Sequence, residues 1–148
     1  MRLQSMTEHK RYIPTPTGFL MVLRQGDDAF ARLEALMEQE SVPSAVISGF
    51  GFAGTVTFGF FDFEKKAYRP KTMETLELTN ITGTLAWKEG KPAIHAHGVA
   101  GDESFRTFGG HLLALEVGRG SLEISITVMP VRLERAVDPD IGANVLQL

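Results

Sequence analysis

Three of the four histidines in this chain fall within one short stretch, IHAHGVAGDESFRTFGGHLL, residues 94–113. His95 and His97 are two residues apart, and His111 directly follows a Gly-Gly pair. Residues two apart on a β-strand point to the same face, so His95 and His97 would project together. Three imidazoles and a water form a recurrent coordination set for Zn²⁺, and imidazole also suits other divalent metals. The spacing predicts a metal site at His95, His97 and His111.

Two other interpretations of the same residues remain open, one without a metal and one with a different metal-binding fold. The chain has no cysteine, so any metal ligands must be His, Asp or Glu. The histidines could instead serve separately, with two facing solvent or a subunit contact and His111 bonded to the loop. A cupin barrel also uses His-x-His, but its glutamate follows the second histidine more closely than Glu103 follows His97.

Acidic and basic residues near the histidines are candidate ligand-binding groups. Zinc lowers the pKa of a bound water to about 7, and a nearby carboxylate would then act as general base. Glu77, Asp102 and Glu103 are the candidates, although Glu77 could pair with an arginine and Asp102 also fits a turn. Arg106 could hold a small anionic ligand or pair with Asp102 or Glu103.

The composition is that of an ordinary globular chain. At 148 residues, with 43% hydrophobic and 22% charged residues, the chain is long enough for one domain with its own core. We expect a flexible tail over residues 1–11, in which Met6 is an alternative start, and a single domain over 12–148. The sequence lacks a run of about 20 apolar residues and a signal-peptide pattern, so we expect a cytoplasmic protein without membrane contact.

The charge balance bears on nucleic-acid binding. The formal net charge is −3, which is the wrong sign for gripping phosphate backbones by bulk electrostatics. The densest basic stretch is EKKAYRPK, residues 64–71, and it is best interpreted as a solvated hairpin turn.

One helix and several strands must position the candidate residues. Residues 27–40 predict a helix capped by Asp27 or Asp28 and ended by residues 41–43. Its apolar face carries Phe30, Leu33, Leu36 and Met37. Strands are predicted from apolar and β-branched runs broken by glycine, at residues 18–26, 45–51, 54–64, 73–90, 93–100, 111–118 and 121–134. A turn at 88–91 joins two of them, and together the elements predict a mainly antiparallel α+β domain.

The order of four motifs resembles the plant-and-prokaryote-conserved (PPC) domain, to which DNA binding has been attributed. These motifs are RQGDD, SAVISGFGFAGTVTFGFFD, LELTNITGTLAWKEGKPAIHAHGVAGD and GGHLLALEVGRGSLEISI, and the resemblance runs from about Tyr12 to Leu148. It implies a barrel-like antiparallel sheet with one packed helix, assembled as a homotrimer. In plant relatives the domain follows an AT-hook that binds A·T-rich DNA, and this sequence contains no Arg-Gly-Arg-Pro hook.

The resemblance also places particular residues. His95 and His97 match the family's His-x-His motif. Its Gly-Gly-His motif is matched by Gly109, Gly110 and His111. Asp102 matches the acidic residue that follows these histidines in the family, and Glu77 matches the glutamate of the family's Leu-Glu-Ile strand.

Two functions therefore remain open on the sequence. The first is a stand-alone, homotrimeric PPC-domain protein that acts as a DNA-associated or regulatory module and carries a three-histidine metal site, with zinc as the expected ion. The second is a metal-dependent enzyme or small-molecule sensor that uses the same histidines with one coordination position open to water.

Overall fold

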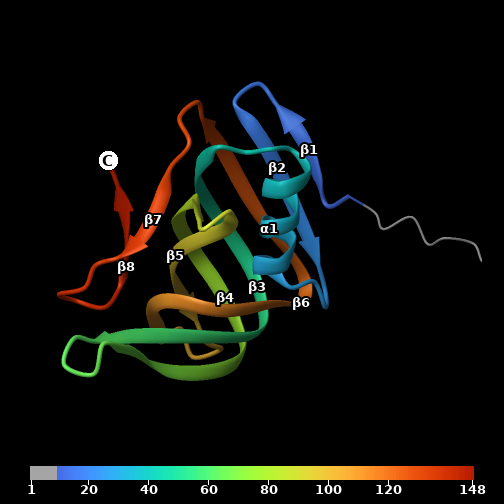
Figure 1. The fold of residues 1–148 in the computed structure, drawn as a ribbon. Helices are drawn as coiled ribbons and strands as arrows, with labels where there is room; N and C mark the ends of the chain where they lie inside the picture. The colour runs from blue at the N-terminus through green and yellow to red at the C-terminus, as the bar shows by residue number, and fades with distance from the viewer. Residues whose placement is uncertain (1–9) are drawn as a thin grey trace, which may run out of the picture.

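The computed structural model describes residues 10–148 (Figure 1). Within this range the chain forms one helix, α1 (Ala29–Gln39), and eight strands. The strands are β1 (Tyr12–Thr15), β2 (Gly18–Arg24), β3 (Ser44–Asp62), β4 (Ala67–Lys88), β5 (Lys91–Gly101), β6 (Thr107–Met129), β7 (Glu134–Val137) and β8 (Asn144–Gln147). No helix in this described range is long and apolar enough to span a bilayer.

Helix α1 matches the predicted helix closely. Asp28 is its N-cap and accepts a hydrogen bond from the backbone N–H of Ala31, so the choice between Asp27 and Asp28 falls on Asp28. Leu33, Leu36 and Met37 are buried, as the apolar spacing predicts. The helix ends at Gln39.

Four of the strands close into a ring. β3 pairs with β4 and with β6, while β5 pairs with the other edges of β4 and β6, all antiparallel. β1 and β2 extend the sheet beyond β6, and β7 and β8 extend it beyond β4 (Figure 1). The predicted α+β class is confirmed, and the barrel-like sheet takes the form of a ring with extended edges.

Two long strands replace pairs of shorter predicted ones. β3 unites the segments predicted at 45–51 and 54–64, and β6 unites most of those predicted at 111–118 and 121–134. The glycines between them mark bulges: the register of β3 shifts between Gly49 and Gly51. A Cβ at Gly51 would lie only 2.3 Å from the backbone oxygen of Ser121. Glycine therefore lets the strand bend and approach β6 without ending it.

Both predicted turns are present. Between β4 and β5, Glu89 and Gly90 have φ values of 52° and 77°, the positive values that a two-residue hairpin turn requires. The basic stretch at 64–71 begins in the turn between β3 and β4 and continues into β4, where the hairpin projects from the body at the lower left of Figure 1. Asp62 caps that turn by accepting hydrogen bonds from the backbone N–H groups of Glu64 and Lys65.

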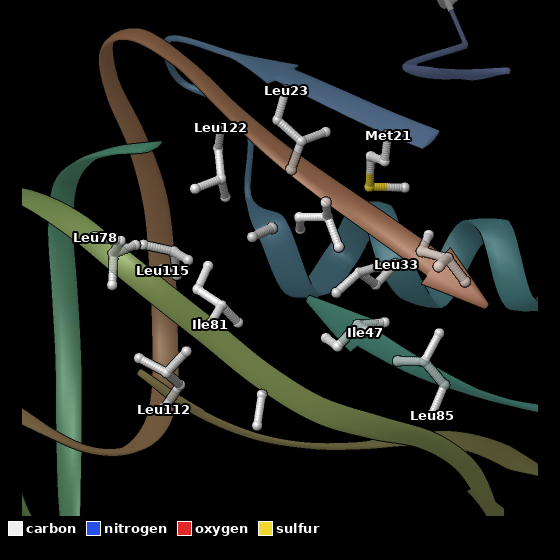
Figure 2. Packing of buried hydrophobic residues seen from close by; sticks show 14 of the residues in the cluster. Met21, Leu23, Leu33, Ile47, Leu78, Ile81, Leu85, Leu112, Leu115 and Leu122 are labelled. Atoms are coloured by element: carbon white, nitrogen blue, oxygen red, sulfur yellow. The ribbon is translucent and has the colours of Figure 1, made fainter. Parts of the chain in front are cut away.

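The hydrophobic core lies between α1 and the inner face of the sheet. Figure 2 shows leucine, isoleucine and methionine side chains from several strands meeting there. Met21 and Leu23 of β2, Leu85 of β4 and Leu122 of β6 are completely buried. This apolar side of the sheet leaves its other side free for polar chemistry.

A buried carboxylate ties the start of the domain to this core. Asp27 accepts hydrogen bonds from Arg11 Nε at 2.9 Å, the Arg24 backbone N–H at 2.8 Å and Arg32 Nη2 at 3.0 Å. Burial opposes ionisation of Asp27, but this N–H group and the two guanidinium charges outweigh it and hold the pKa of Asp27 below its usual value. The predicted tail otherwise falls on residues 1–9, outside the described range.

Asp27→Asn should destabilise the domain. Removing the charge leaves two arginines facing a neutral amide, and we expect a loss of about 1–3 kcal/mol at pH 7 in urea unfolding. Because the folded-state pKa of Asp27 lies below its unfolded value of about 3.9, its contribution is present above that pH and is lost as the pH falls through the folded-state value. The difference between variant and wild type should therefore shrink in acid.

The matched control is Asp140→Asn, at an exposed aspartate. It should unfold like the wild type. A difference between Asp27→Asn and wild type that stayed constant between pH 7 and pH 3 would contradict the role given to the carboxylate charge.

Candidate metal centre

The three clustered histidines come from the two strands that close the ring. His95 and His97 lie on β5, and Ala96 between them is only 3% exposed and belongs to the core. Alternation along the strand therefore places both histidines on the outer face of the sheet. His111 lies on β6 directly opposite His97 in the strand register, and its neighbour Leu112 points into the core in Figure 2. The structure thus brings the three histidines together on one face.

The spacing of the ring nitrogens suits a metal ion. One ring nitrogen from each histidine can be chosen so that all lie within 4.8 Å of one another. His95 Nε2 and His97 Nε2 are 3.2 Å apart. With Zn–N bonds of about 2.0–2.1 Å, tetrahedral coordination separates two ligand nitrogens by roughly 3.3–3.4 Å. The donor set could therefore hold a metal ion once the more widely spaced nitrogens draw closer together.

The Gly-Gly pair before His111 lies within strand β6 and does not form the turn that precedes this strand. The chain reverses in the loop at 102–106, whereas Gly109 and Gly110 already lie within β6 and pair with β5. A Cβ at Gly109 would lie 2.8 Å from the backbone oxygen of Gly98. A larger residue would therefore push β6 away from β5, so the glycine allows the close approach that sets His111 beside His97.

Tyr68, at the start of β4, holds the His111 ring in place. The two rings stack with centroids 4.2 Å apart and an interplanar angle of 16°. The Tyr68 hydroxyl lies 3.3 Å from His111 Nδ1. Gly59 makes room for this stack, because a Cβ there would lie 2.9 Å from the Tyr68 ring. Outer partners of this kind orient metal-binding imidazoles.

The surroundings keep two of the imidazoles neutral. Burial lowers the pKa of His111 to about 4, and the neighbouring His95 and His97 add to the effect. Burial also lowers the pKa of His95, with further contributions from the charges of Arg135 and His97. Because a metal binds only the neutral imidazole, these shifts leave lone pairs available at neutral pH.

The other predicted ligand-binding residues lie elsewhere. Glu77, Asp102 and Glu103 line a separate hollow of about 750 Å³ that includes none of the three histidines. Asp102 accepts hydrogen bonds from the backbone N–H groups of Ser104 and Arg106, as its turn position predicts. Arg106 also forms an ion pair with Asp102, with Nη2 2.8 Å from Oδ2. In this arrangement Asp102 orders the 102–106 loop.

Two residues that the sequence did not single out do border the cluster. Tyr68 is 43 positions from His111, and Arg135 of β7 comes from the C-terminal edge of the sheet. Neither lies in a motif, because only the pairing of distant strands brings them to the histidines.

Asp102→Ala should loosen the loop without affecting the histidines. Loss of three hydrogen bonds to Asp102 frees the backbone before Arg106, so trypsin should cut after Arg106 severalfold faster in limited proteolysis. Glu103→Ala is the matched control, since Glu103 is the next residue and its side chain is exposed. Equal cleavage rates in the two variants would show that Asp102 does not order the loop.

The fold and the cluster together define a class: a β-rich domain with one helix, a ring-forming sheet and three histidines on the outer face of two adjacent strands. The family model of the Plants and Prokaryotes Conserved (PCC) domain matches residues 12–130, and the chain belongs to this family. This confirms the resemblance to the PPC domain. No curated protein matches the chain.

Solved structures of relatives support the same assignment. A "Putative DNA-binding protein" from Ralstonia eutropha JMP134 is 56% identical, with a TM-score of 0.90 and coverage of 93% of this chain and 96% of that one. A "Metal-containing Protein" from Archaeoglobus fulgidus is 30% identical, with a TM-score of 0.79 and coverage of 88% and 92%. A PPC protein from Pyrococcus horikoshii is 26% identical, with a TM-score of 0.82 and coverage of 99% and 98%.

Proposed function

We propose that this PPC-domain protein binds a divalent metal ion, with zinc as the expected ion, through His95, His97 and His111. The observation that carries the proposal is the convergence of three ring nitrogens within 4.8 Å on two adjacent strands. The Archaeoglobus fulgidus relative, described as metal-containing, supports it. Because neutral imidazoles are the only ligands in the cluster, the bound site carries the full positive charge of the ion.

This chain's residues prepare the site in two ways. Tyr68 orients the His111 ring, and burial keeps His95 and His111 unprotonated. A bound zinc ion with three protein ligands has a position open to water or to an oxygen of a small molecule. The alternative function as an enzyme or sensor depends on that open position.

Replacing one histidine should abolish metal binding. His97→Ala removes a ligand directly, so its effect should exceed the roughly 10- to 100-fold loss that removal of an outer partner causes. We expect metal analysis of tag-free wild-type protein to give about one ion per chain, and His97→Ala to hold only traces. His9→Ala is the matched control, since His9 is the fourth histidine, and it should retain the metal. Metal-free wild-type protein that also fails to take up added zinc would refute the proposal.

The homotrimer implied by the family resemblance remains part of the proposal. Several large apolar side chains are exposed on the strands of the ring, as a subunit interface would require. They include Phe50, Phe52, Val99 and Leu113.

A second candidate function is DNA association, which one surface of the chain favours. The β3–β4 hairpin carries Lys65, Lys66, Arg69 and Lys71 beside the exposed rings of Phe60 and Phe63. The Arg69 guanidinium lies 5.6 Å from the Phe60 ring centroid. Aromatic and basic groups interleaved in this way suit nucleic-acid backbones and bases. The description of the Ralstonia eutropha relative also supports this candidate.

DNA binding by this hairpin should depend on its charge and on salt. Arg69→Glu should weaken binding of duplex DNA at all sequences and reduce the salt dependence, because each phosphate contact contributes a slope of about 0.9 in the logarithm of affinity. Arg119→Glu, at an exposed arginine of β6, is the matched control. Undetectable binding by the wild type at about 50 mM salt, or equal effects of the two variants, would eliminate the hairpin as a DNA-binding surface.

A further inference from the structure

Arg135 carries a buried charge without a counterion. Its side chain is only 7% exposed, and Nη2 donates a hydrogen bond to Thr84 Oγ1 on β4. Its Nε atom is buried without a hydrogen-bond partner, and no carboxylate within residues 10–148 forms an ion pair with it. Burying an unpaired charge in a protein interior costs on the order of several kcal/mol. Such a group calls for an anion from outside the chain.

Arg135 lies beside the metal centre. Thr84, which accepts its hydrogen bond, is directly opposite His95 in the pairing of β4 with β5. The charge of Arg135 contributes to the low pKa of His95, as expected for neighbouring groups. Arg135, His95, His111 and Tyr68 all line one cavity of about 390 Å³. The guanidinium and the histidine cluster therefore face a shared space.

The rest of this cavity suits a short carbon chain with a negative charge. Pro92, Ala93 and Ile94 contribute apolar walls. Lys88, Lys91 and Glu89 complete the charged lining, so with Arg135 there are three cations and one carboxylate, a balance of 3 − 1 = +2. A volume near 390 Å³ is at the small end of the range for ligand pockets, which runs from about 300 to 1,000 Å³.

We propose that this cavity binds a small organic carboxylate, with Arg135 as the residue that recognises the carboxylate group. The planar guanidinium fork matches a carboxylate with two parallel hydrogen bonds, and a bound carboxylate would offset the charge that no carboxylate of residues 10–148 pairs with. A ligand held there extends toward His95 and His111, so a second oxygen on it reaches the metal centre. The inference rests on the proposed metal function only for that second contact.

A purely structural role for Arg135 would look different. A side chain that only held β7 against β4 would be satisfied by Thr84 and would need no cavity and no surrounding lysines. Both roles predict some loss of stability when Arg135 is replaced, so ligand binding must be measured directly.

The test measures acetate and malonate binding by calorimetry on tag-free protein of known metal content. Arg135→Gln retains a hydrogen-bond donor toward Thr84 but removes the charge, and we expect malonate affinity to fall roughly 10- to 100-fold. Metal content of this variant should match the wild type. Arg132→Met is the matched control, because Arg132 precedes β7 and lies over the Trp87 ring, outside the cavity lining. Its affinity should equal that of the wild type.

A second measurement needs no variant. Malonate should shift the NMR signals of the Arg135 guanidinium in the wild-type protein, since that group gains a counterion. Acetate has a single carboxylate and needs only Arg135, so its binding to metal-free protein tests this inference separately from the metal proposal. If the protein holds no metal and still binds acetate through Arg135, the metal proposal fails and this one stands.

Three results would overturn the inference. The first is no binding of either carboxylate to metal-loaded wild type at millimolar concentration. The second is binding that Arg135→Gln leaves unchanged. The third is Arg135-dependent binding of inorganic phosphate alone, which would exclude a carboxylate as the ligand.

Discussion

The pairing of β5 with both β4 and β6 is the contact on which the rest of this structure depends. It closes the ring, and its register sets His97 opposite both Thr82 and His111. Side chains alternate between the two faces of a strand, so a slip of one residue would bury the histidines and expose Ala96. The small, buried Ala96 and the apolar core behind it therefore hold the histidines on the outer face.

The same constraint separates the two sides of the sheet chemically. The inner side holds an apolar core against α1, while the outer side beside β5 gathers imidazoles, Tyr68 and the Arg135 guanidinium. Partial burial on that outer side disfavours protonation of His95 and His111 and leaves the Arg135 charge without a counterion. An anionic ligand would offset both the Arg135 charge and the charge of a metal ion held by the imidazoles, so the two proposed sites are compatible.

Periodicity predicted the helix and most of the strand residues, and its errors have two causes. The glycines near residue 52 led to a predicted break between two strands, yet β3 continues through them. Glycine between two paired neighbours permits a bulge as readily as a turn. Strands β1, β7 and β8 have four residues each, too short for an alternating pattern to distinguish them from loops. They form because neighbouring strands offer unpaired backbone groups: β1 pairs with β2, β7 with β4 and β8 with β7.

The sequence alone determined the residue types available for chemistry and the face that two of them share, because alternation along a strand is a local property. It therefore predicted His95 and His97 as a pair, with His111 as the third member. Only the tertiary structure decided that Tyr68 stacks on His111 and that Arg135 reaches the same cavity. Those contacts join β4, β6 and β7 across tens of residues, and strand pairing at that distance depends on the packing of the whole sheet.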